Sequence, residues 1–181
     1  KGKKIYIPEM IFGNLLTSTN YDKEEKKVVG GKNGYGAKLT NIFSTYFKVE
    51  TVDHKRQLKY TQEFGQNMKV TKKPKVTHSK SKPFTKISWI VDFQRFGITS
   101  YSSVMIKLME RRVYDVAGIT DKKVSVHLNK KKLQVNDFQG YSKMYISDEP
   151  LVYEEMNQRW KIGVSLSEDK FEHISFVNGI A

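Results

Sequence analysis

The spacing of apolar residues changes near residue 47, and this change limits the folds that the chain can adopt. Before it, four apolar residues recur at i, i+3, i+4 and i+7, which predicts an amphipathic helix running to about Tyr46: Leu39, Ile42, Phe43 and Tyr46. After it, Phe47, Val49 and Thr51 alternate with charged neighbours, and Leu58 and Tyr60 continue the alternation in a second strand. A helix that leads directly into an antiparallel pair indicates an α+β fold with a mixed, largely antiparallel sheet, rather than a doubly wound parallel sheet.

Three other stretches carry recognisable patterns. A short helix is expected from Pro8, where proline stands in the first turn. The stretch ISWIVDF alternates as a strand with Ile90 behind it, so we expect it to be covered on both sides; one face holds Ile87, Trp89, Val91 and Phe93. The stretch SSVMIKLMERRVYDVAG predicts a helix that serine caps open and Gly118 closes.

Two hairpins are expected in the second half of the chain. KVSVHL and LQV flank the turn NKKK, with Val124, Val126 and Leu128 facing inward. WKIGVSLSE and FEHISFVNGIA also alternate, and together they predict the opening hairpin of a second sheet.

The charge of the chain favours an acidic partner. With 32 Lys and Arg against 19 Asp and Glu, the net charge is +13, which suits nucleic acid or nucleotide but also fits a soluble basic domain. The chain has no cysteine, and its four histidines have no metal-ligand spacing, so we expect no metal site held by this chain. No apolar run approaches the ~18 residues of a membrane span, so no membrane partner is expected.

Residues 66–86 form the most basic stretch, with seven lysines, two prolines and no acidic residue. Such a composition is most often a solvated, flexible loop. The alternative is a patch that binds nucleic acid.

The segment GGKNGYGAKL, residues 30–39, places four glycines and two lysines before the first amphipathic helix. It is not a Walker A loop, because Lys38 is displaced by one position and Leu39 replaces the hydroxyl residue. The Rossmann pattern also fails, because no third glycine stands at position 39 and no strand precedes the loop. Glycines let backbone N–H groups approach an anion, and a helix N-terminus attracts one, so the segment is either a phosphate-binding loop or a flexible connector.

Several strings of the chain resemble the ATPase region of eukaryotic-type type II DNA topoisomerases (type IIA): IYIPEMIFGNLLTSTNYD, GGKNGYGAKLTNIFST, RRVYDVAG and ISFVNGIA. The resemblance runs from Ile5 to Ala181 and is weakest across the basic stretch. It implies the GHKL (Bergerat) ATPase sandwich, followed by a transducer domain. Residues 1–135 would then be the C-terminal part of the GHKL domain with its ATP lid, and residues 136–181 a linker and the beginning of the transducer.

The resemblance also implies the residues that bind ATP. The family's lid loop corresponds to a run that wraps the triphosphate: Gly31, Lys32, Asn33, Gly34, Tyr35, Gly36, Ala37 and Lys38. Lys32 stands where the family has arginine, and it lacks the planar fork needed for bidentate contact. The family's Ser-Ser-Asn contact with nucleotide corresponds to Ser18, Thr19 and Asn20.

The rest of the family's site is expected outside this chain. Its general-base glutamate, its magnesium-binding asparagine and its adenine-reading motif would precede Ile5, and its Gln-Thr-Lys motif would follow Ala181. The cofactors implied are ATP and Mg²⁺, but no catalytic residue and no metal ligand are expected within residues 1–181. The isolated chain is therefore expected to be inactive.

The function implied is that of a nuclear enzyme that passes one double-stranded DNA through a break in another. Such an enzyme is a homodimer that closes through its ATPase gate, and its DNA-cleaving tyrosine lies in a later domain. Two alternatives come from other classes. One is a non-catalytic basic module that binds nucleic acid, and the other is a different GHKL-family ATPase, of the mismatch-repair or chaperone type.

Overall fold

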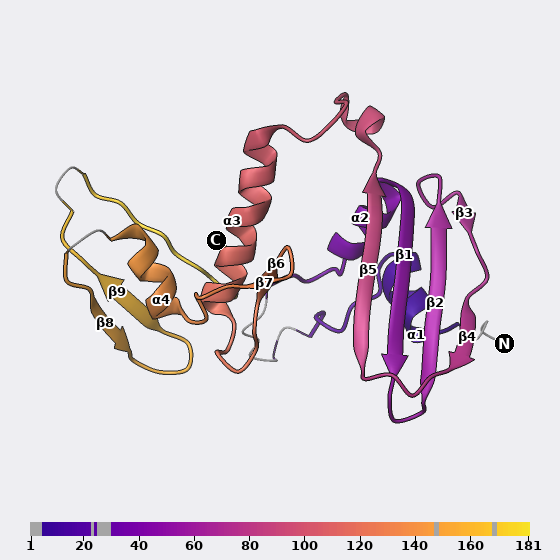
Figure 1. Ribbon diagram of the computed structural model, residues 1–181, viewed down its shortest axis with the longest axis horizontal. Helices are drawn as coiled ribbons and strands as arrows, with labels where there is room; N and C mark the ends of the chain where they lie inside the picture. Colours follow the sequence, from indigo (N-terminus) through magenta and orange to yellow (C-terminus); the bar gives the residue numbers. More distant parts are fainter. Residues whose placement is uncertain (1–4, 23, 25–29, 147–148, 168–169) are drawn as a thin grey trace. The chain divides into compact units, whose positions relative to one another are not determined.

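The computed structural model describes residues 5–22, 24, 30–146, 149–167 and 170–181, and Figure 1 shows its helices and strands. The contacts divide the chain into two compact units. Unit 1 is Lys1–Glu25 with Gly31–Ser100, and unit 2 is Lys26–Gly30 with Tyr101–Ala181. This division concerns contacts within the present chain, so the expected domain boundary at 135/136 stays a prediction.

Unit 1 contains a five-stranded sheet whose pairings are all antiparallel. The order is β3-β2-β1-β5, and β4 also pairs with β2. The strands are β1 (Ser44–Asp53), β2 (Leu58–Gly65), β3 (Val70–Thr71), β4 (Lys75–His78) and β5 (Phe84–Val91). The helices α1 (Ile7–Gly13) and α2 (Gly36–Ile42) lie behind the sheet in Figure 1. The expected α+β fold with a largely antiparallel sheet is therefore confirmed.

The core of unit 1 is built on one face of β1 and β2. Phe47, Val49, Tyr60 and Phe64 are buried there, and Phe12 of α1 packs on them with its ring 6.1 Å from that of Phe47. Phe47 and Val49 are two residues apart and Tyr60 and Phe64 are four apart, as the alternating pattern requires. The sequence therefore identified the buried face of both strands.

The helix that contains Leu39 ends earlier than predicted. It closes at Ile42, where the Phe43 N–H bonds to the Leu39 carbonyl and the Ser44 hydroxyl donates to the Thr40 carbonyl at 2.6 Å. Tyr46, which the helical spacing included, lies in β1. The prediction was wrong because helical spacing alone does not show where the chain becomes extended: Tyr46 already pairs in β1, on the face opposite to that of Phe47.

The basic stretch is not the open loop that its composition predicted. Val70–Thr71 and Lys75–His78 both pair with β2, and the Lys72 N–H bonds to the Glu63 carbonyl at 3.0 Å. The stretch thus runs along the edge of the sheet as an interrupted strand. Edge strands rich in lysine and proline are common, because such residues hinder pairing with another chain.

β5 is not covered on both sides within the described part of the chain. Trp89 and Ile90 are 50% and 58% exposed, although Ile87 packs against the core. Phe93, expected on the same face as Ile87, lies instead in the 3₁₀ helix η1 (Phe93–Phe96). The prediction failed because apolar residues on both faces of a strand do not by themselves supply elements that cover it.

Unit 2 is organised around α3 (Ser103–Ile119). The Ser102 side chain caps it, as predicted, by accepting a hydrogen bond from the Met105 N–H. Gly118 does not end the helix. It lies inside it, where an added Cβ would meet the Tyr141 side chain at 2.7 Å, and the helix closes at Thr120. This glycine serves close packing against α4 (Phe138–Ser142) rather than termination.

The remaining elements of unit 2 are short. They are β6 (His127–Leu128), β7 (Lys131–Lys132), η2 (Lys143–Tyr145), β8 (Val152–Glu155) and β9 (Lys161–Val164). The hairpin around NKKK exists, but its strands have two residues each and Val124 is 55% exposed rather than inward. β9 pairs with β8 and not with residues 171–176, so the partner in the last predicted hairpin was wrong.

Candidate functional site

The glycine loop, residues 31–38, lies in unit 1 and leads into α2. Residues 31–37 are exposed, whereas Lys38 is only 2% exposed. The segment 17–20, which carries the other predicted nucleotide-binding residues, contacts this loop at several points. The structure therefore brings together the two groups of residues that the family resemblance implied.

Lys38 makes the firmest connection between the two segments. Its Nζ atom donates to the carbonyl oxygen of Gly34 at 2.8 Å and to that of Thr17 at 3.2 Å. The first bond closes the loop on itself, and the second attaches it to the segment 17–20. A lysine ammonium has three donors, so one N–H remains for another acceptor.

Gly34 permits this close approach. Its φ is +66°, and an added Cβ would lie 2.8 Å from the Thr17 carbonyl oxygen and 3.4 Å from the Ser18 Cβ. A side chain here would meet both an unfavourable backbone conformation and a backbone atom. Glycine is therefore required at this position.

Asn20 adds a second connection. Its Nδ2 atom donates to the Gly31 carbonyl oxygen at 3.1 Å, and its own N–H bonds to the Ser18 hydroxyl at 3.1 Å. The Ser18 oxygen acts as acceptor there, so its proton stays available to another group. Thr19 lies between them and is exposed.

The electrostatics of the site favour an anion. The Lys38 ammonium is buried, and among the described residues it contacts two neutral carbonyl groups and no carboxylate. A buried charge normally has a partner of opposite sign, because its removal from water is costly. A phosphate oxygen near the free Lys38 donor would supply that charge.

The comparisons with known proteins are consistent across sequence and structure. The chain is 48% identical to DNA topoisomerase 2 of Arabidopsis thaliana over 98% of its own length and 13% of that protein. It is 44% identical to DNA topoisomerase 2-beta of Gallus gallus over 100% of its length and 12% of that protein. The chain thus spans only about an eighth of these relatives. A scan against protein-family models finds no match.

Solved structures show which part of these relatives the chain resembles. The ATPase region of Saccharomyces cerevisiae topoisomerase II superposes with a TM-score of 0.89 and 46% identity, covering 97% of this chain and 47% of that one. The chain belongs to the ATPase region of the eukaryotic type II DNA topoisomerase family. The ATPase and transducer domains of DNA topoisomerase II from Balamuthia mandrillaris give 0.86 and 43%, over 97% of this chain and 46% of that one.

This membership confirms the family resemblance and the GHKL fold that it implied. Family membership does not by itself assign roles to individual residues. The nucleotide contacts expected in this topoisomerase region therefore remain predictions.

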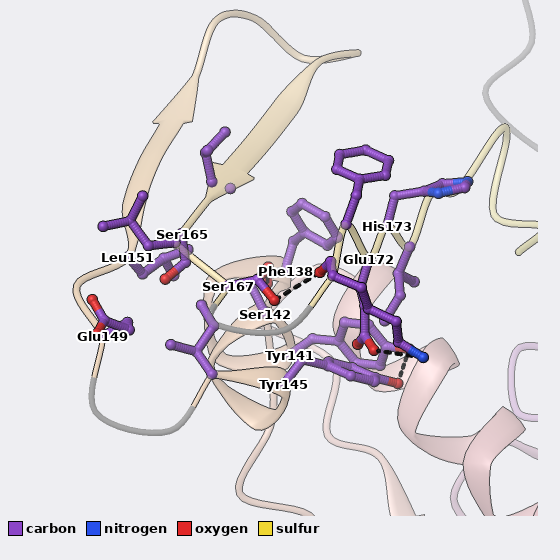
Figure 2. A pocket seen from close by; sticks show the side chains of 17 residues that line it. Phe138, Tyr141, Ser142, Tyr145, Glu149, Leu151, Ser165, Ser167, Glu172 and His173 are labelled. Carbon is purple, nitrogen blue, oxygen red and sulfur yellow. Dashed lines mark hydrogen bonds and ion pairs between the residues drawn. The ribbon is translucent and has the colours of Figure 1, made fainter.

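Unit 2 contains a pocket that is separate from the predicted nucleotide contacts. The pocket has a volume of ≈ 980 Å³. Figure 2 shows it beside α4 and β9, with the side chains of Phe138, Tyr141 and Tyr145 among those that line it. Tyr141 and Tyr145 lie there, their hydroxyl groups 2.9 Å apart. None of its lining residues belongs to the glycine loop or to residues 18–20, so the topoisomerase resemblance gives this pocket no nucleotide role.

The described ranges contain no cluster of metal ligands and no helix that could span a membrane. No group of three or more His, Cys, Asp or Glu side chains there could hold a metal ion. No helix within these ranges has the length and apolarity that crossing a bilayer demands.

Sequence reasoning missed two features of the site. Thr17 contributes a backbone carbonyl to the loop, and no side-chain pattern marks such a role. Lys38 was expected to face a phosphate with its charge, yet two of its donors hold the loop together. The only sequence signal was its position one turn after Gly34, which suits an i, i+4 contact.

Proposed function

We propose that the chain is part of an ATP-dependent type II DNA topoisomerase, an isomerase that passes one DNA duplex through a double-strand break in another. In this proposal, the glycine loop is the ATP lid. Its support is the attachment of the loop to segment 17–20 through Lys38 and Asn20. Sequence relatives named DNA topoisomerase 2 supply the reaction class.

The triphosphate would be held by residues of both segments. Glycines at 31, 34 and 36 leave the backbone uncovered, so that loop N–H groups can approach phosphate oxygens. Lys38 would direct its third donor to the same group, and the Ser18 hydroxyl would donate its proton. Lys32 would add a mobile positive charge, since its side chain is exposed.

ATP would supply the hydrolysable phosphate and Mg²⁺ would neutralise part of its charge. No group of three or more His, Cys, Asp or Glu side chains in the described residues could hold the metal ion. The contribution of this chain is therefore to bind and enclose the triphosphate. The family resemblance places the magnesium ligand and the base before Ile5.

Nucleotide binding would also change the association of two subunits. A ligand shifts a conformational equilibrium only by its difference in affinity for the two states. If the loop contacts ATP better when the gate is closed, ATP favours the closed homodimer. Closure would capture double-stranded DNA in the nucleus, where a eukaryotic enzyme of this class acts.

The test uses the protein that spans the whole ATPase region, because this chain covers about half of the solved relatives. Binding of a non-hydrolysable ATP analogue and dimerisation are measured for the wild type, Gly34→Val and Lys38→Ala. Lys123→Ala, an exposed lysine of unit 2, is the matched control. We expect the two loop variants to lose at least tenfold in affinity and to stay monomeric, with the control unchanged.

Two results would overturn the proposal. Normal analogue binding by both loop variants would make the loop a connector. Absence of binding in the wild type, together with salt-sensitive DNA binding, would favour a basic nucleic-acid-binding module.

A further inference from the structure

One face of the sheet in unit 1 carries a surplus of lysines. The pairing register places Lys75 opposite Thr61, Thr61 opposite Glu50, and Glu50 opposite Lys86, so one row crosses β4, β2, β1 and β5. Lys59 and Lys48 lie in the neighbouring rows of the same face. In the same register, Phe47, Val49 and Tyr60 belong to the opposite, core-facing side.

The acidic residues of this face already form ion pairs with neighbouring lysines. Glu50 accepts ion pairs from Lys48 at 3.3 Å and Lys59 at 3.1 Å, and Glu63 pairs with Lys72 at 2.7 Å. Five lysines and two glutamates leave this face positive. In the described part of the chain, no ion pair is formed by Lys75 or Lys86.

The turn between β4 and β5 extends the same charge. It carries Lys80 and Lys82, both exposed, and the Ser79 N–H fixes it to the Gln57 carbonyl at 2.8 Å. Figure 1 shows this turn and the β1–β2 turn at one end of the sheet. We name the lysine face by its seven members: Lys48, Lys59, Lys72, Lys75, Lys80, Lys82 and Lys86.

We propose that the lysine face is a docking surface for the phosphate backbone of double-stranded DNA. Four adjacent strands separate the Lys75 and Lys86 backbones by about 14 Å at the usual strand spacing. This is close to the ~12 Å width of a major groove, so two flexible lysines can reach phosphates on both of its sides. Contacts of this kind are independent of sequence, and they weaken at higher salt because the release of counterions from DNA then gains less free energy.

Charge decides the class of partner. An apolar protein surface would leave the unpaired ammonium groups without water, which is costly. A DNA backbone supplies a negative charge for each of them. The inference extends the proposed function by assigning DNA contact to a specific surface, and it does not depend on nucleotide binding by the glycine loop.

The competing explanation is that lysines only protect the edge strands β4 and β5 from pairing with other chains. That accounts for Lys75 and Lys86, which lie on those strands. It does not require Lys80 and Lys82 in the turn, nor the absence of any acidic residue from 66 to 86. The two explanations make different predictions for DNA affinity.

The experiment compares two quadruple variants of the full chain with equal loss of charge. The face variant is Lys75→Gln, Lys80→Gln, Lys82→Gln and Lys86→Gln. The control replaces four exposed lysines of unit 2: Lys123→Gln, Lys130→Gln, Lys131→Gln and Lys132→Gln. Binding of a fluorescent 20-base-pair duplex of mixed sequence is measured by anisotropy between 50 and 200 mM KCl, and thermal unfolding checks that both variants fold.

We expect the face variant to bind the duplex at least tenfold more weakly at 100 mM KCl. Its slope of log K against log salt should fall by about 0.9 for each lost phosphate contact, and the control should change less than threefold. Equal weakening in both variants would overturn the proposal in favour of net charge alone. Unchanged DNA binding by the face variant, with or without aggregation, would overturn it in favour of edge protection.

A parallel measurement of analogue binding in the whole ATPase region separates this inference from the proposed function. Failure of the wild type to bind nucleotide, with a selective DNA defect in the face variant, would leave the lysine face supported while removing the ATP lid. Normal nucleotide binding by the wild type, without a selective DNA defect in the face variant, would leave the ATP lid supported while removing the lysine face.

Discussion

The Nζ atom of Lys38 lies 3.2 Å from the carbonyl oxygen of Thr17, 21 residues earlier in the chain. The same atom donates to the Gly34 carbonyl at 2.8 Å. One buried ammonium group therefore fixes both the internal shape of the glycine loop and its attachment to segment 17–20. The order of the loop therefore depends on Lys38, together with the bond from Asn20 to Gly31.

Replacing Lys38 by methionine should loosen the loop more than it destabilises the protein. The change removes two hydrogen bonds worth about 1 kcal/mol each, but it also removes the cost of burying an ammonium group. We expect hydrogen exchange at residues 39–43, whose N–H groups bond within α2 directly after the loop, to become at least tenfold faster, measured by mass spectrometry. Lys32→Met, at an exposed position, is the control and should leave exchange unchanged. Equal exchange in both variants would contradict the role of Lys38.

Two glycines of the loop should respond to alanine in opposite directions. At Gly34, φ is +66° and the new Cβ would lie 2.8 Å from the Thr17 carbonyl oxygen, so we expect a loss of about 1–3 kcal/mol. At Gly36, the first residue of α2, nothing lies within 4 Å of an added Cβ. Alanine there should stabilise by about 0.5–1 kcal/mol, because it restricts the unfolded chain.

Urea unfolding of both alanine variants checks this prediction. Opposite shifts of the midpoint at an unchanged slope are expected. A shift of the same sign and size at both positions would show that the loop does not hold the conformation described.

Local patterns predicted the parts of the fold that depend on local chemistry. The alternation in β1 and β2 identified their buried face, and the Ser102 cap identified the start of α3. These features follow from side-chain period and from one hydroxyl group beside a helix end. The side-chain period and the capping hydroxyl can each be recognised from a few consecutive residues.

Features that depend on distant partners could not be predicted in this way. The basic stretch becomes a strand only because β2 offers an edge to pair with. Gly118 reads as a helix end, yet it is needed inside α3 because Tyr141, 23 residues later, packs against it. Lys38 likewise finds its acceptor on Thr17, to which no local pattern points.

Tyr141 provides a test of buried polar contacts in unit 2. Its hydroxyl group donates to Oδ1 of Asp115 at 2.7 Å, and both residues are buried, at 2% and 5% exposed. Burial and the neighbouring Tyr145 and Asp115 raise the pKa of the Tyr141 hydroxyl group above its usual range. The phenol thus stays protonated and keeps donating throughout the neutral range.

Tyr141→Phe should therefore destabilise the protein by about 1–3 kcal/mol, because it leaves the buried Asp115 carboxylate with one donor fewer. Tyr153→Phe is the matched control, since its hydroxyl group donates to the exposed Glu155 at 2.8 Å. We expect the control to cost less than about 0.5 kcal/mol. Denaturant unfolding measures both, and equal losses would mean that burial of Asp115 adds nothing.

The ion pairs on the lysine face predict a loss of stability in acid. Hydrogen bonds from Lys59 and Lys48 lower the pKa of Glu50 despite opposing burial, and a hydrogen bond from Lys72 lowers the pKa of Glu63. A carboxyl group with a lowered pKa in the folded state stabilises the fold above its unfolded pKa, for which the reference value is 4.5. That contribution is lost as pH falls below 4.5 and through the lower folded pKa values.

Glu50→Gln separates this contribution from other effects of acid. At pH 7 the variant should be less stable than the wild type by up to about 1 kcal/mol, since Glu50 serves two lysines but the pairs are partly exposed. Near pH 3 the difference should shrink, because the wild-type carboxyl group becomes increasingly protonated. Urea unfolding at several pH values measures it, and Glu172→Gln, in the exposed pair with Lys170, is the control. A difference that stays constant from pH 7 to pH 3 would show that Glu50 acts through packing rather than through its charge.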